Sequence, residues 1–81
     1  MFRKLVKATE IEIDGTRYTL RYDELKTIRG GRRFSCEVLL GVGDRIILDD
    51  DSMLSLESKV ARLVPATVYS RALAARPSVA A

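Results

Sequence analysis

Two stretches of the chain alternate apolar and polar side chains with the two-residue period of a β-strand. The first stretch, Glu10 to Leu20, is interrupted by Asp14-Gly15, a dipeptide that accepts the positive φ angles of a type I′ turn. This turn predicts a β-hairpin whose apolar side chains share one face and whose charged side chains share the other. The predicted register pairs Ile13 with Thr16, Glu12 with Arg17 and Ile11 with Tyr18.

The second alternating stretch runs from Arg33 to Asp49 and contains Gly41-Val42-Gly43. A three-residue loop with Gly43 in the left-handed region keeps more apolar side chains on one face than a two-residue turn does. It leaves Leu39 and Ile47 side by side on the opposite face, as a second contact surface or an interface. The predicted register pairs Val38 with Ile46 and Cys36 with Leu48, and the apolar face carries Phe34, Cys36, Val38, Leu40, Ile46 and Leu48.

The segment between the two hairpins contains a tight-turn signal, Gly30-Gly31. A strand that ran straight through this segment would place Leu25 on the opposite face from Leu20. We therefore expect a β-bulge near Asp23-Glu24 to correct the alternation. Residues 2–7 are expected to be an extended lead-in to the first hairpin, either as an edge or as the start of its first strand.

From Asp51 onward the apolar spacing changes to that of an amphipathic helix. Ser52 or Asp51 can cap the first amides of this helix. Pro65 lacks an amide donor and clashes with the preceding turn, so we predict a helix that is kinked or broken there and continues to about Ala74. The apolar positions are Met53, Leu56, Val60, Leu63, Val64, Val68, Tyr69, Ala72 and Leu73.

These elements predict a two-layer α+β fold, in which a four-stranded antiparallel sheet from two β-hairpins carries a C-terminal helix on one face. Residues 1–74 would form the single domain and residues 75–81 a flexible tail. The passage over residues 33–64, in which a glycine loop and Asp44–Asp49 lead into a helix starting near Ser52, resembles in outline the HicB-type antitoxin module and other partial double-stranded-RNA-binding-like folds. The resemblance concerns the order of elements, and no residue role is transferred from it.

Composition limits the chemistry of the chain. With no histidine, imidazole catalysis and His-ligated metal sites are excluded, and one cysteine forms neither an intrachain disulfide nor a thiolate cage. The start of the chain lacks the apolar core of a signal peptide, and no apolar run approaches the roughly 18 residues of a membrane span. We expect a cytoplasmic protein that does not enter a membrane. Since a core of this size rarely supplies more than about 3–5 kcal/mol, we also expect self-association, in the simplest case a homodimer.

The net charge of +3 conceals three blocks of alternating sign. Residues 1–33 carry +4, residues 34–58 carry −5 and residues 59–81 carry +4. A dedicated nucleic-acid binder usually has a more one-sided balance. This pattern favours folding back on itself, or stacking of copies head to tail.

None of the chemically active side chains forms a convincing reactive set. The acids of Asp49-Asp50-Asp51 match a helix start and lack the spacing of a calcium loop. Cys36 lies among alternating apolar residues and is interpreted as a core thiol. Of the carboxylate pairs Glu10/Glu12 and Asp23/Glu24, the first lies on a solvated strand face, and no pocket is indicated for acid–base chemistry. We therefore predict that the protein is not an enzyme and that it has no catalytic residue, metal or cofactor.

The remaining hypothesis is a small non-catalytic interaction module that self-associates or binds a larger protein partner. Its interface would use the strip Leu39 and Ile47, or the helix residues Val68, Tyr69 and Leu73. The alternative is a nucleic-acid or phosphate binder that uses the basic Gly-Gly loop 26–33. In that alternative the contacts are made by Lys26, Arg29, Arg32 and Arg33.

Overall fold

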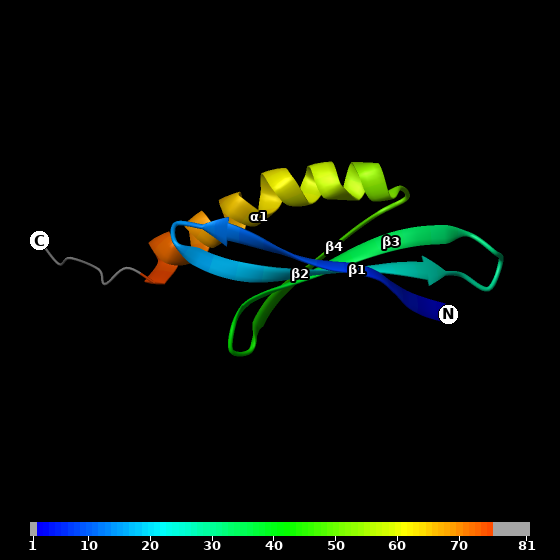
Figure 1. Cartoon of the computed structure of the whole chain (residues 1–81), viewed down its shortest axis with the longest axis horizontal. Coiled ribbons are helices and arrows are strands. Elements are labelled where there is room, and N and C mark those ends of the chain that lie inside the picture. Colours follow the sequence, from blue (N-terminus) through cyan, green and yellow to red (C-terminus); the bar gives the residue numbers. More distant parts are fainter. Residues whose placement is uncertain (1, 76–81) are drawn as a thin grey trace, which may run out of the picture.

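The computed structural model describes residues 2–75 of the chain. Four strands form one antiparallel sheet in the order β1-β2-β3-β4, and the helix α1 lies along one face of it (Figure 1). This is the predicted α+β fold. Ala75, the first residue of the predicted tail, is the last residue of α1, and the remainder of that tail lies outside the described residues. The bounds are β1 Phe2–Ile13, β2 Thr16–Lys26, β3 Arg32–Gly41, β4 Asp44–Asp50 and α1 Met53–Ala75.

The hairpin between β1 and β2 has the predicted turn and register. Asp14 and Gly15 have φ angles of 50° and 80°, as a type I′ turn requires. The turn dipeptide and the alternation on either side of it therefore predicted the pairing next to the turn. The observed pairs are Ile13 with Thr16, Glu12 with Arg17 and Ile11 with Tyr18.

The hairpin between β3 and β4 also has the predicted register, with Val38 opposite Ile46 and Cys36 opposite Leu48. Gly43 takes the left-handed conformation, with a φ of 72°. The ladder is irregular between Leu39 and Gly41, where β3 contains one extra residue. Gly41 pairs with Asp44, so the loop has two residues and not the predicted three, and the extra residue Leu40 restores the predicted register.

The predicted bulge at Asp23-Glu24 is wrong. Strand β2 pairs with β3 without interruption, from Leu20 opposite Val38 to Lys26 opposite Arg32. The irregularity lies instead in β1, between Leu5 and Lys7, so Val6 is the inserted residue. A bulge in the central strand β2 would disturb two ladders, whereas one in the edge strand β1 disturbs a single ladder.

The core is one layer of side chains between the sheet and α1. Its helix residues, Leu56, Val60 and Val64, are at most 2% exposed. The Ser52 hydroxyl caps α1 by accepting a hydrogen bond from the Ser55 amide at 3.1 Å, as predicted. The sheet contributes Leu20, Tyr22, Cys36 and Val38 to this core.

Helix α1 continues through Pro65, so a break into two helices did not occur. Its axis changes direction in its second half (Figure 1), as expected of a proline kink. The Thr67 hydroxyl donates a hydrogen bond to the Leu63 carbonyl at 2.8 Å, an interaction that also bends helices. Within residues 2–75, no helix is both long and apolar enough to cross a membrane.

Candidate interaction surface

The sheet has one face under α1 and a second face turned away from it, which we call the open face. Its residues follow from strand alternation and register: Asp23 of β2 lies opposite Leu5 of β1 and Ser35 of β3, and Glu37 lies opposite Ile47. The open face includes Arg3, Leu5, Arg21, Asp23, Leu25, Arg33, Ser35, Glu37, Leu39, Arg45, Ile47 and Asp49.

Large apolar side chains are exposed on the open face. Leu39 and Ile47, the strip predicted from the sequence, are each 55% exposed, and Leu5 is 52% exposed. The strip is therefore on the surface of the chain and does not complete the core. Leu5 was not predicted to lie on this face, because residues 2–7 alternate too weakly to assign it to either side of the sheet.

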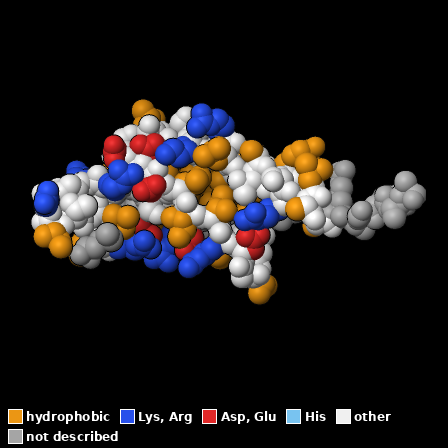
Figure 2. Space-filling model, turned by 180° about the vertical axis from the view of Figure 1, so that it is seen from behind, with side chains coloured by type: hydrophobic (Ala, Val, Ile, Leu, Met, Phe, Trp, Pro, Cys, Tyr) orange, Lys and Arg blue, Asp and Glu red, His pale blue; other side chains and the backbone are white. Residues whose placement is uncertain are grey.

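The charges around these apolar residues are arranged in ion pairs. Arg45 Nη1 lies 3.1 Å from Glu37 Oε2 across β3 and β4. Arg33 Nη2 lies 3.0 Å from Asp49 Oδ2, and its other terminal nitrogen pairs with Asp51. Hydrogen bonding to Asp49 and the nearby negative charges raise the pKa of Arg33. Figure 2, which views the sheet from its edge, shows basic, acidic and apolar side chains intermixed, with several basic side chains along the lower margin.

Asp23 is the unusual residue of the open face, since its side chain is almost fully buried without a covering element. The residue is 1% exposed and lies between the guanidinium groups of Arg3 and Arg21. The nearest nitrogen-oxygen distances are 3.6 Å to Arg3 and 3.5 Å to Arg21, and within the described chain Oδ1 accepts no hydrogen bond. A buried carboxylate with ion pairs but incomplete hydrogen bonding contributes little net stability. Asp23 therefore places a fixed negative charge beneath the exposed part of this face.

The predicted helix residues do not form one surface. Val68 is half-buried and packs against the core, whereas Tyr69 and Leu73 are 63% and 45% exposed. Val68 therefore belongs to the protein's own core rather than to a free interface. Because α1 covers the face opposite Leu39 and Ile47, the two predicted patches do not come together.

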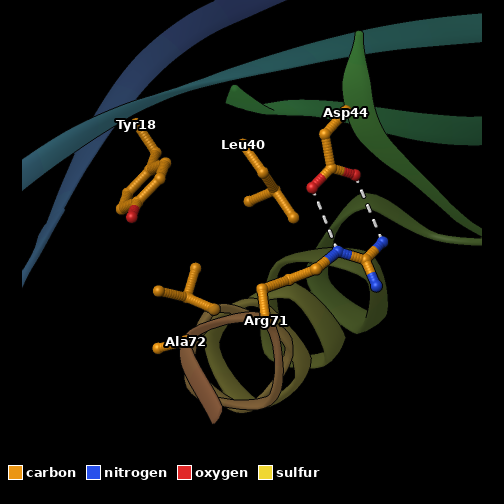
Figure 3. Close-up of a pocket in the computed structure, with 6 residues that line it drawn as sticks. Tyr18, Leu40, Asp44, Arg71 and Ala72 are labelled. Carbon is orange, nitrogen blue, oxygen red and sulfur yellow. Dashed lines mark hydrogen bonds and ion pairs between the residues drawn. The ribbon is translucent and has the colours of Figure 1, made fainter. Parts of the chain in front are cut away.

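A shallow pocket lies where the end of α1 faces the sheet (Figure 3). Its volume is about 260 Å³, and Arg71 closes one side through paired contacts to Asp44 at 3.1 and 3.2 Å. The charges of Arg71 and Asp44 thus neutralise each other in an ion pair between α1 and the sheet, and the other lining atoms are mainly apolar. The lining residues are Tyr18, Leu40, Asp44, Val68, Arg71 and Ala72.

The basic loop is only partly available for binding anions. Thr27 and Gly31 close it, because the Thr27 amide donates to the Gly31 carbonyl at 2.9 Å. The Arg32 guanidinium donates to Glu24 and lowers the pKa of that carboxyl, while Arg33 is held by Asp49 and Asp51. Among residues 2–75, no ion pair involves the other two predicted cations, Lys26 and Arg29.

The residues considered for chemistry are in structural positions. Cys36 is fully buried, and burial raises the pKa of its thiol to about 11, so it is protonated at neutral pH. Asp50, just before α1, pairs with Lys59 through an Oδ2–Nζ distance of 3.3 Å. A hydrogen bond from the Asp51 amide is the main cause of the lowered pKa of Asp50. Residues 2–75 contain no group of three or more acids or thiols placed to hold a metal ion.

Comparison with known proteins adds no relative: no family model, curated protein or solved structure matches this chain. The outline resemblance to the HicB-type antitoxin module is thus not supported by a match.

Proposed function

We propose that this protein is a small non-catalytic interaction module whose contact surface is the open face of its sheet. The occupant is a second copy or a larger protein. The observation that carries the proposal is the exposure of Leu39 and Ile47, each 55%, on a sheet face that no element of residues 2–75 covers.

The composition of the open face supports a protein partner. Protein interfaces combine apolar side chains with arginines and paired charges, and their overall apolar content is close to that of other surface. Here Leu39 and Ile47 lie beside the ion pair of Arg45 with Glu37, and Leu5 lies opposite the buried Asp23 two strands away. An unpaired charge would be costly to bury against a partner, but a charge that already has its counter-ion is less so.

The alternative, anion binding by the basic loop, has weaker support. Two of its four cations are neutralised within the chain, because Arg32 pairs with Glu24 and Arg33 with two aspartates. Binding of a polyphosphate would have to compete with these pairs, or depend on Lys26 and Arg29 alone.

Sedimentation of the full chain, in parallel with its native assembly size in extracts of its host, tests the open face. The variants Leu39→Lys and Ile47→Lys place a charge in the apolar strip and should abolish the contacts made through the open face, while circular dichroism shows that the chain is still folded. Val42→Lys is the matched control, because Val42 is an exposed apolar residue at the β3–β4 turn, outside the open face. If both open-face variants assemble as the wild type does, the proposal is wrong.

A further inference from the structure

Strand β1 is the more accessible of the two edge strands. It is 12 residues long, and nearly all its side chains are exposed or half-exposed, including Phe2, Leu5 and Val6 at 59%, 52% and 48%. The other edge, β4, is shorter and is partly occupied: Lys59 Nζ donates to the Asp49 carbonyl at 2.8 Å, and α1 packs on this strand. A long unpaired edge is a template for pairing with another strand.

The bulge at Val6 divides the alternation of β1 into two parts of opposite phase. Before it, Arg3 and Leu5 lie on the open face, whereas after it Ala8, Glu10 and Glu12 do. If β1 were a uniform strand of 12 residues, pairing it end to end with an antiparallel second copy would place open-face residues of one copy opposite helix-face residues of the other. With one bulge in each copy, both halves of the strand match face to face along the full length.

We propose that two copies of the chain pair antiparallel through β1, with the two-fold axis at Ala8, and join their sheets into one continuous sheet. In this register Glu12 of each copy lies opposite Arg3 of the other on the open face. The apolar Ile13 and Phe2 pair on the helix-bearing face. The remaining pairs are Ala8 with Ala8, Thr9 with Lys7, Glu10 with Leu5 and Ile11 with Lys4.

Charge selects this register over its neighbours. With the axis at Ala8, the cations Arg3, Lys4 and Lys7 each lie opposite an acid, an apolar residue or a threonine, and no cation lies opposite a cation. Moving the axis to Lys7 would place two lysines directly opposite each other, which destabilises a ladder. Moving it to Thr9 would leave Phe2 and Arg3 beyond the end of the partner strand and would form no ion pair.

This pairing has a geometric consequence for the surface proposed above. A two-fold axis perpendicular to the sheet places both helices on the same side and both open faces on the other. The two strips of Leu39 and Ile47 then belong to one extended surface, at a distance from the axis because β3 and β4 are the strands farthest from β1. The inference concerns the β1 edge of the sheet, whereas the proposed function depends on Leu39 and Ile47 on β3 and β4, so it can fail independently of the proposed function.

Disulfide trapping in the full chain tests the register. Directly opposite Cα atoms in antiparallel strands are about 4.5–5.5 Å apart, within the range of about 4.4–6.8 Å that a disulfide spans. We therefore expect Ala8→Cys to oxidise rapidly to a covalent dimer. The matched control is Glu10→Cys on the same face, whose two copies would be about 13 Å apart along the strands and should not cross-link. The native Cys36 remains in both variants because it is fully buried.

Charge reversal tests the same pairing in solution. Sedimentation should show a reversible wild-type dimer, and Glu12→Arg should weaken it about tenfold or more, because like charges then meet at both ends of the ladder. Arg17→Glu is the control. Like Glu12→Arg, it turns the Glu12–Arg17 pair within the chain into a pair of like charges, but it leaves Glu12 opposite Arg3 of the second copy. A monomeric wild type, equal cross-linking of Ala8→Cys and Glu10→Cys, or equal weakening by both charge variants would overturn the proposal. Leu39→Lys should not affect the Ala8→Cys cross-link, which separates this result from the test of the open face.

Discussion

The two faces of the sheet are made from alternate residues of the same strands, yet they differ in the way they exclude water. On the helix-bearing face, Val38 and Leu56 are fully buried in a layer made mainly of apolar side chains. On the open face the most buried side chain is a carboxylate, Asp23, enclosed by two arginines, while the apolar Leu39 and Ile47 remain exposed. We conclude that apolar burial on the helix-bearing face supplies most of the stability of the fold, whereas the open face is accessible to other molecules.

The largest expected difference between the faces is in the free energy of unfolding. Leu56→Ala removes a fully buried side chain from a thin core and should cost about 2–5 kcal/mol. Ile47→Ala on the open face should change the stability of the monomer by less than about 0.5 kcal/mol. Urea denaturation of both variants, at a concentration where the chain is monomeric, measures the two values. A larger loss for Ile47→Ala would contradict the assignment of the core.

Alkaline pH should destabilise the chain through the helix-bearing face. Burial raises the pKa of Tyr22 to about 12 and that of Cys36 to about 11. Because both groups ionise more readily in the unfolded chain, their contribution is complete at neutral pH and is lost as pH rises from about 9 through these values. Chemical denaturation under reducing conditions at increasing pH should therefore show falling stability. Cys36→Ala should make this dependence shallower, and an unchanged slope would show that the thiol does not contribute.

Asp23 should respond differently from a core residue although it is equally buried. Desolvation of this carboxylate offsets much of its attraction to Arg3 and Arg21, so Asp23→Asn should alter the free energy of unfolding by about 1 kcal/mol or less. The measurement is urea denaturation at neutral pH beside the wild type. A loss as large as that of Leu56→Ala would show that the two faces contribute equally to stability.

The smallest effect is expected for the basic loop. We expect the variant with both Lys26→Ser and Arg29→Ser to show the same weak, salt-sensitive retention on heparin as the wild type. Circular dichroism should confirm that this exposed loop tolerates both changes. Strong retention of the wild type that the double variant loses would instead favour the nucleic-acid or phosphate-binding alternative.

Local signals in the sequence predicted most of the fold. Asp14-Gly15 predicted the register of the β1–β2 hairpin. The count of apolar side chains around Gly43 predicted that of the β3–β4 hairpin and placed Leu39 and Ile47 on the open face. The position of the β1 bulge could not be predicted, because residues 2–7 alternate weakly and the straight path of β2 depends on its pairing with β3. The burial of Asp23 depends on Arg3, which is distant in sequence and joins it only through the β1–β2 ladder.

The kink at Pro65 divides α1 into two parts of unequal anchoring. Leu56, Val60 and Val64 all precede the proline, whereas between Pro65 and Ala75 no side chain is fully buried. The Arg71 tether to Asp44 is an exposed ion pair, which secures the second part only weakly. The end of the helix should therefore fray and close again without global unfolding, so its amides would exchange with solvent well before those of the first half.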